Sequence, residues 1–192
     1  MEPEREIIAR AVEESSGVLG SLLEEQHFSA LSAAVELLAG MLDNDGKLLL
    51  FGNGGSAADA SHIATEFVGR FLRDRAAAPA ISLSDNPAAI TAIANDYGFE
   101  QIFARQVEAL ARPGDVALAI STSGNSPNVV AGARAARQRE VAVIGLTGAS
   151  GGALAAECEI LIAAPSSSTP RVQEAHTFIA HALCELVERR MP

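Results

Sequence analysis

The fold of this chain is decided by the stretch Leu48-Leu49-Leu50-Phe51-Gly52-Asn53-Gly54-Gly55-Ser56. Its first half is a short continuous apolar run, which predicts a buried strand, and its second half is a glycine-rich turn. Residues 57–72 follow with the pattern of a helix. A strand that runs through such a turn into a helix is typical of α/β proteins that bind phosphate, because the free N–H groups at the helix start point at the anion.

The same arrangement recurs at residues 117–126, where an apolar run leads into Ser121-Thr122-Ser123-Gly124-Asn125-Ser126. Four hydroxyl groups lie within these six residues, between a predicted strand and a predicted helix. Hydroxyl and backbone N–H groups can bind a phosphate dianion without a lysine. Because both loops follow parallel strands, we expect them to meet over one crevice at the carboxyl edge of the sheet.

The first loop is a weak signal by itself. Glycine-rich turns also serve simple strand-to-helix reversal. This loop lacks the lysine of a nucleotide P-loop and the spacing of a dinucleotide-binding fingerprint. The hydroxyl-rich second loop is therefore the stronger indication of a phosphate site.

The rest of the chain alternates helices with short apolar strands, which predicts an α/β fold with a five-stranded parallel sheet covered on both faces. The two helices before the first strand predict an N-terminal helical hairpin that covers the sheet or enters an oligomer interface. We expect Ser29 to cap the second helix and residues 95–99 to form a polar loop. The predicted helices are 4–25, 29–42, 57–72, 87–94, 100–111, 127–138, 151–157 and 172–189, and the predicted strands are 48–51, 79–84, 116–120, 141–146 and 160–164.

The composition limits the class of protein. The chain has 192 residues, of which 48% are hydrophobic and 20% charged, as in an ordinary globular domain. Its net charge of −10 argues against nonspecific binding of nucleic acid. No apolar run is long enough to span a membrane, and the charged N-terminus does not resemble a secretory signal, so we expect a cytoplasmic protein. Cys158 and Cys184 are expected to be reduced, buried thiols.

Polar residues on two helices are further candidates for a site. His62 and Glu66 are four residues apart after the first loop, so they share a helix face, and Asp59 lies on the same side. Such a face is also typical of a solvated helix surface, but its closeness to the phosphate loop favours a function. The last helix contributes Gln173, Glu174, His176 and His181. Helical geometry leaves the choice between Gln173 and Glu174 open, and a lone histidine on such a helix is more often structural.

Together these motifs resemble those of the bacterial phosphoheptose isomerases (sedoheptulose 7-phosphate isomerases), which belong to the sugar-isomerase, or SIS, fold group. The resemblance extends over essentially the whole chain. It implies a single SIS domain over residues 1–192, with N-terminal helices over 1–45 and an α/β core over 46–192. It rests on Gly52–Ser56, Asp59, His62, Glu66, Asn95-Asp96, Ser121–Ser126, Arg171–His176 and His181.

The resemblance implies an aldose–ketose isomerase that converts sedoheptulose 7-phosphate to D-glycero-D-manno-heptose 7-phosphate, the first step of nucleotide-activated heptose biosynthesis. Such a reaction moves a proton between C1 and C2 through an enediolate, which needs a base at carbon and an acid at oxygen. By the same resemblance Glu66 is the base and His181 its acid/base partner. The implied substrate-binding residues are Asn53, Gly54, Gly55, Ser56, Glu66, Asn95, Asp96, Ser121, Thr122, Ser123, Ser126 and Gln173.

The resemblance also implies a zinc ion and a homotetramer with active sites at subunit contacts. The implied zinc ligands are His62, Glu66, Gln173 and His181. Two imidazoles, a carboxylate and an amide oxygen make a reasonable zinc set. A carboxylate bound tightly to zinc is a poorer base, and the sequence leaves open whether zinc polarises the substrate or holds the site together. We expect a sugar phosphate as the small-molecule partner, and no nucleic acid or membrane.

Two other interpretations stay open at this point. One relative of these isomerases is a noncatalytic phosphosugar-fold protein that binds the bacterial replication initiator, and it departs from the isomerase pattern at the position of Glu66. This chain has both Glu66 and His181, which favours the enzyme. A regulator that senses a sugar phosphate usually carries a DNA-binding domain, and none is visible in the sequence.

Overall fold

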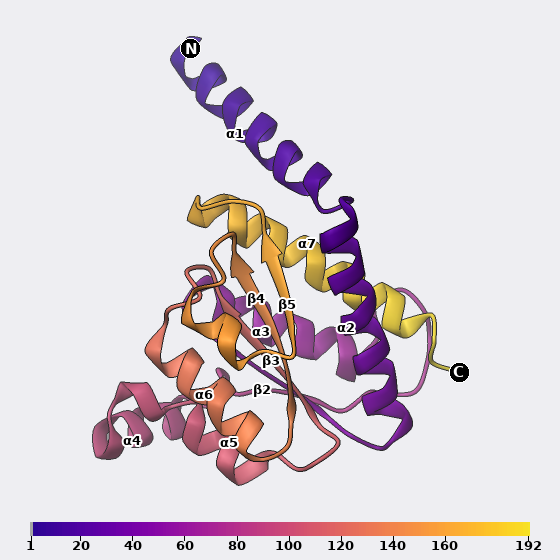
Figure 1. The fold of residues 1–192 in the computed structure, drawn as a ribbon, viewed down its shortest axis with the longest axis vertical. Coiled ribbons are helices and arrows are strands. Elements are labelled where there is room, and N and C mark those ends of the chain that lie inside the picture. The colour runs from indigo at the N-terminus through magenta and orange to yellow at the C-terminus, as the bar shows by residue number, and fades with distance from the viewer. Residues whose placement is uncertain (1) are drawn as a thin grey trace.

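A parallel sheet of five strands lies at the centre of the computed structural model, which describes residues 2–192 (Figure 1). The strands stand in the order β2-β1-β3-β4-β5. They are β1 (Leu48–Gly52), β2 (Ala80–Ser82), β3 (Val116–Ser121), β4 (Ala142–Gly148) and β5 (Ile160–Ala164). The predicted sheet is confirmed, and the chain reverses its winding direction between β1 and β3, where every residue of β1 is paired with β3.

The continuous apolar run of β1 fits a strand that is buried on both faces. Its side chains alternate between two hydrophobic cores. Leu48 and Leu50 pack in a core covered by α2 (Glu25–Asp43), α3 (Gly55–Val68) and α7 (Thr169–Glu188). Leu49 and Phe51 pack in a second core covered by α5 (Ala104–Leu110) and α6 (Pro127–Gln138). The sheet therefore holds α3 and α7 on the same face.

The remaining elements are α1 (Glu2–Ser21), α4 (Pro87–Tyr97) and two short 3-10 helices, η1 (Phe99–Gln101) and η2 (Gly152–Glu157). Some local predictions are wrong. Residues 95–97 belong to α4 and not to a loop, and the predicted helix over 100–111 is divided between η1 and α5. Ser29 lies inside α2, whose N-cap is Glu24. The predicted start of α4 is confirmed, with the side chain of Asn86 accepting a hydrogen bond from the Ala89 N–H at 3.0 Å.

The first helix projects away from the rest of the molecule (Figure 1). Both predicted N-terminal helices are present, but α1 contacts α7 and does not fold back along α2. The Ser15 hydroxyl donates to Glu174 at 2.5 Å, where α1 crosses the start of α7. Ile8 and Val12 are 64% and 60% exposed on its outer part. No helix within residues 2–192 is long and apolar enough to cross a membrane.

The two cysteines are free thiols, as expected. Cys184 is buried on α7 and Cys158 is half-buried after η2. Burial raises the pKa of each thiol to about 12, so both stay protonated at neutral pH.

The segment after α3 is held by a buried carboxylate at the end of α7. We predicted a helix as far as residue 72, yet α3 ends at Val68. The carboxylate of Glu188 accepts hydrogen bonds from the backbone N–H groups of Phe71, Leu72 and Arg73 at 2.8–2.9 Å, so these groups are not available to a helix. Arg75 lies 3.3 Å from the same carboxylate, and both side chains are at least 97% buried.

The guanidinium group of Arg75 joins this cluster to α3. It donates to the carbonyl oxygens of Glu66 and Phe67 at 2.7 and 2.8 Å, which satisfies carbonyl groups in the last turn of the helix. Burial alone would raise the pKa of the Glu188 carboxyl, but the three N–H groups and Arg75 outweigh it and hold this pKa below its ordinary value. We call Glu188, Arg75 and the backbone of residues 71–73 the Glu188 clamp.

We expect Glu188→Gln to lower the free energy of unfolding by about 3 kcal/mol at pH 7, because it leaves the buried Arg75 without its counter-charge. A carboxyl whose pKa is lowered in the folded state contributes stability above its unfolded-state pKa and loses it as the pH falls through the folded-state value. The difference from the unmodified chain should therefore shrink below about pH 4.5. Urea unfolding at several pH values measures it.

Glu185→Gln is the matched control. Glu185 lies on the same helix and makes an exposed ion pair with Arg189, so its loss should change the free energy of unfolding by less than about 1 kcal/mol. Equal losses in the two variants would contradict a special role for the Glu188 clamp.

Candidate functional site

The two predicted loops meet where the winding direction of the sheet reverses. Gly52 at the end of β1 pairs with Ile120 in β3, so Asn53 and Ser121 both lie at the carboxyl edge of neighbouring strands. The side-chain amides of Asn53 and Asn128 exchange two hydrogen bonds of 2.8 Å, which fix the first loop to the first turn of α6. A crevice at such a reversal point is where open α/β sheets bind ligands.

The second loop directs hydroxyl groups to the start of α6. Ser121 is 3% exposed, and its Oγ lies 3.1 Å from the Oγ of Ser126, which is the N-cap of α6. Gly124 has φ = +66°, and a Cβ there would overlap the carbonyl oxygen of Gly151. The hydroxyl of Ser123 accepts the Asn125 N–H at 3.1 Å. Thr122 is half-buried between them. The hydroxyl groups and the helix start make this loop suited to an anion.

The first loop brings α7 to the start of α3. Gly54 has φ = +57° and is the N-cap of α3, a backbone conformation that glycine adopts without strain. A Cβ on Gly55 would overlap Nε2 of Gln173, so the Gln173 amide packs directly against this loop. Ser56, which follows in the first turn of α3, is buried. Gln173 rather than Glu174 therefore faces the candidate site, and Glu174 instead pairs with Arg171 at 2.9 Å.

Helices α3 and α7 run parallel and in contact, and we call this line of contacts the α3–α7 seam. About one turn after the contact between Gly55 and Gln173, the Thr177 hydroxyl donates to Asp59 at 3.1 Å. One turn further, Nε2 of His62 lies 2.9 Å from Nε2 of His181. Their rings meet edge to face, with centroids 5.1 Å apart. His62 also lies 3.6 Å from the carboxylate of Glu66, whose side chain is 20% exposed. The seam thus gathers three of the predicted site residues: His62, Glu66 and His181.

The predicted zinc ligands are only partly assembled. Among the side chains of residues 3–192, no three from His, Cys, Asp or Glu form a group that could hold a metal ion. Glu66 and His181 each contact His62, so the three make a chain of contacts and not a shell around one point. Gln173 is eight residues before His181, or about 12 Å along the helix. The donor types suit zinc, because imidazole nitrogen and carboxylate oxygen are its usual ligands.

The fold does not place Asn95 and Asp96 at the two predicted loops. They are exposed in the last turn of α4, and the amide of Asn95 donates to Asp96 at 2.8 Å. His176 has a structural place: it is fully buried, with Nε2 3.0 Å from the carbonyl oxygen of Thr147. Burial lowers its pKa, so the ring is neutral and Nε2 carries the donated proton.

Sequence reasoning missed Asn128, which is 2% exposed and holds the two loops together. The available signal was an amide in the first turn of a helix that directly follows the hydroxyl-rich loop. Such a residue is equally common as a solvated helix start, and only the fold shows that Asn53 lies opposite it.

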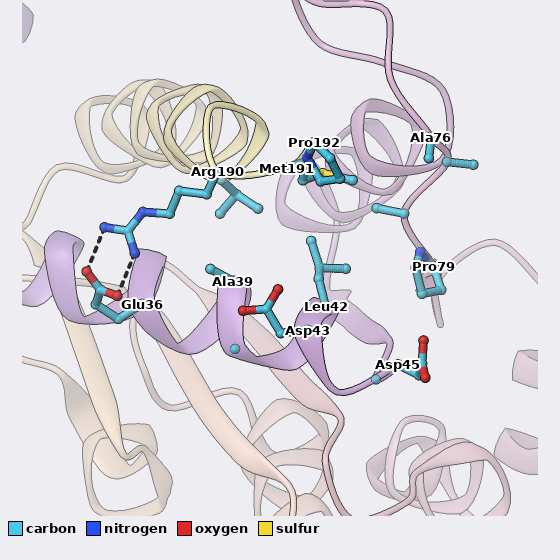
Figure 2. Close-up of a pocket in the computed structure, with 15 residues that line it drawn as sticks. Glu36, Ala39, Leu42, Asp43, Asp45, Ala76, Pro79, Arg190, Met191 and Pro192 are labelled. Carbon is cyan, nitrogen blue, oxygen red and sulfur yellow. Dashed lines mark hydrogen bonds and ion pairs between the residues drawn. The ribbon is translucent and has the colours of Figure 1, made fainter.

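A cavity of about 590 Å³ lies at the other edge of the sheet (Figure 2). It is bounded by α2, the segment before β2 and the C-terminal residues. Asp43 and Asp45 face it, and Glu36 accepts two bonds from Arg190 at 2.5 and 2.6 Å. Acidic side chains disfavour a phosphorylated ligand, so this cavity is not the candidate site.

Comparisons with known proteins agree with this geometry. The model of the SIS domain family matches residues 12–148. The phosphoheptose isomerase of Roseiflexus sp. (strain RS-1) is 57% identical over 146 residues, which are 76% of this chain and 74% of that protein. Solved phosphoheptose isomerases from Neisseria gonorrhoeae and Francisella tularensis superpose with TM-scores of 0.86 and 0.92 at 40% and 36% identity. They cover 98% and 97% of this chain, and 98% of each solved chain is covered.

We expect inorganic phosphate to stabilise the protein against thermal unfolding through the hydroxyl-rich loop. The double variant Ser121→Ala/Ser123→Ala should need about tenfold or more phosphate for the same stabilisation, because each lost hydrogen bond to an anion is worth about 1.5–3 kcal/mol. Ser29→Ala, which removes an exposed hydroxyl on α2, is the control. The same phosphate response in all three proteins would remove the anion site from this loop.

Proposed function

Because the chain belongs to the phosphoheptose isomerases of the SIS domain family, we propose that its two loops and the α3–α7 seam form one active site. The protein is an aldose–ketose isomerase of heptose biosynthesis, which converts sedoheptulose 7-phosphate to D-glycero-D-manno-heptose 7-phosphate. The observation that supports this site best is the position of His62, Glu66 and His181 on the same seam as the phosphate loops.

The spacing along the seam suits a sugar phosphate. Gly55, in the first loop, and His62 are seven residues apart on α3, or about 10 Å. The substrate carries its phosphate at C7 and reacts at C1 and C2, near the other end of the carbon chain. A phosphate in the two loops would therefore place the reacting carbons toward His62, Glu66 and His181.

The side chains on the seam can perform the proton transfers. We assign Glu66 as the base that moves the proton between C1 and C2, because its carboxylate is partly shielded and its backbone is held by Arg75. His181 is assigned as the acid/base partner at the substrate oxygens, since its Nε2 faces the same point as that of His62. Asn53, Gly54, Gly55 and Gln173 would line the sugar, and Ser56, Ser121, Thr122, Ser123 and Ser126 the phosphate.

We propose that His62, Glu66 and His181 hold a zinc ion. Their donor types fit the metal, and His62 lies 2.9 Å from His181 and 3.6 Å from the carboxylate of Glu66. When bound, zinc would polarise substrate oxygens and stabilise their developing negative charge. Gln173 stays a predicted fourth ligand, and Asn95 and Asp96 stay predicted contacts of the sugar.

We expect Glu66→Gln to abolish exchange of the substrate C–H proton with solvent deuterium and to reduce turnover by about 10²–10⁴-fold, because a general base is lost. The amide is nearly isosteric, so folding and substrate binding should survive. His181→Ala should lose both turnover and bound metal, and chelation of the unmodified enzyme should abolish an activity that zinc restores. NMR of the substrate and metal analysis measure these effects.

Glu108→Gln, a change to an exposed carboxylate on α5, is the control. Near-normal turnover in Glu66→Gln would remove the base assignment and favour a noncatalytic sugar-phosphate-binding protein. Full activity in protein shown to be free of metal would remove the zinc proposal alone.

We also propose that the SIS domain comprises residues 1–192 and that copies of this chain form a homotetramer. Support comes from the apolar side chains that α1 exposes, among them Ile7, Ile8 and Val12. A hollow of about 280 Å³ continues this surface and is lined by apolar residues, including Leu23, Phe28 and Phe178. A sugar phosphate carries a charge that membranes exclude, so we place the enzyme in the cytoplasm with its substrate.

Light scattering should give a mass near four times 19.9 kDa for the full chain. Ile8→Asp with Val12→Asp should reduce this mass, because buried apolar surface in the interface would acquire charge. Arg10→Ala changes the opposite side of α1 and should leave the assembly intact. A fully active 19.9 kDa monomer would contradict the proposal.

A further inference from the structure

An aromatic ring from outside both helices packs on His181. The rings of Phe71 and His181 have centroids 5.4 Å apart and an angle of 30° between their planes, a tilted arrangement within the range of aromatic pair contacts. His62 meets the same imidazole edge to face at 81°. The His181 ring therefore has two aromatic neighbours, which meet it at different angles.

Such contacts are needed to orient the ring. The second side-chain torsion of histidine has broad energy minima, so the helix backbone does not by itself set the plane of the imidazole. His181 is only half-buried, and neighbouring rings must supply the constraint.

Phe71 is itself held in place by its backbone. It lies in the irregular segment after α3, where its N–H donates to Glu188 Oε1 at 2.9 Å. The next residue, Leu72, is held in the same way at 2.8 Å, but its side chain is 60% exposed. The Glu188 clamp thus fixes the ring of Phe71 against His181, although the segment has no helix or strand to stiffen it.

We infer that Phe71 is a positioning residue for the isomerase reaction: its ring, fixed by the Glu188 clamp, sets the plane in which His181 presents Nε2. This inference rests on the proposed role of His181. Phe71 lies in the segment after the end of α3, whereas the first loop precedes the start of that helix. The effect of Phe71 should therefore appear in the rate of the chemical step and not in substrate binding.

The test compares Phe71→Leu, which keeps apolar volume but removes the ring, with Phe71→Tyr, which keeps the ring. Leu72→Ala is the matched control on the same clamp, since it leaves the backbone N–H groups in place. We expect kcat of Phe71→Leu to fall about 10–100-fold, because a misplaced catalytic group costs that much. KM and the thermal midpoint should stay near those of the full chain. Phe71→Tyr should retain most of kcat, and Leu72→Ala all of it.

A second measurement does not depend on activity. The chain has four histidines, so ¹H–¹³C spectra of the imidazole rings can be assigned by substitution. In Phe71→Leu the His181 signals should lose the ring-current shift from Phe71, while those of His27 and the buried His176 stay in place. In Phe71→Tyr and Leu72→Ala the His181 signals should remain as in the full chain.

The inference would be overturned by His181 signals that do not move in Phe71→Leu, or by an unchanged kcat in an active Phe71→Leu enzyme. A fall in kcat of equal size in Leu72→Ala would also overturn it, since the effect would then belong to the segment and not to the ring. An unmodified chain without isomerase activity would instead refute the proposed function, and the spectra would still show whether Phe71 orients His181.

Discussion

The parallel register of α3 and α7 is the constraint on which the candidate site depends. Both helices lie on one face of the sheet, and matched contacts join them at successive turns, from Gly55 with Gln173 to His62 with His181. A slip of one residue would rotate each helix by about 100° and separate these pairs. The first loop and the proposed proton-transfer groups are therefore held in fixed positions relative to each other, because α3 begins at that loop and carries His62 and Glu66.

Two buried polar clusters fix the position of α3 in the fold, one at each end of the helix. At the loop end, the Asn53–Asn128 amide pair ties the start of α3 to α6 across the sheet edge. At the other end, the Glu188 clamp ties the end of α3 to the last turn of α7. Both clusters are almost fully satisfied by hydrogen bonds, which gives buried polar groups directional specificity that apolar packing lacks. The helices cannot slide without breaking one of them.

The sequence predicted the parts with a strong local pattern and missed those that only the fold brings together. Continuous apolar runs predicted all five strands, and the hydroxyl-rich loop was found because its residues are adjacent. The predicted end of α3 was wrong because Glu188, more than a hundred residues away, accepts hydrogen bonds from the backbone N–H groups of residues 71–73. Helical periodicity left Gln173 and Glu174 undecided, since the answer depends on which face of α7 meets Gly55. Asn128 gave only an ambiguous signal and Phe71 gave none, because each acts through a partner that is distant in sequence.

The same geometry bears on how one carboxylate could fill both proposed roles, as a ligand of a metal and as the base for a carbon-bound proton. The backbone of Glu66 is fixed, because Arg75 donates to its carbonyl oxygen at 2.7 Å. The carboxylate is held less tightly: it lies 3.6 Å from His62, beyond hydrogen-bonding distance. A side chain anchored at its base and loosely held at its tip can change partners by rotating its own torsions, with no movement of the helix. In the proposed site His62, Glu66 and His181 would hold the metal, which would polarise the substrate oxygens, and the loosely held carboxylate of Glu66 could reach the carbon-bound proton.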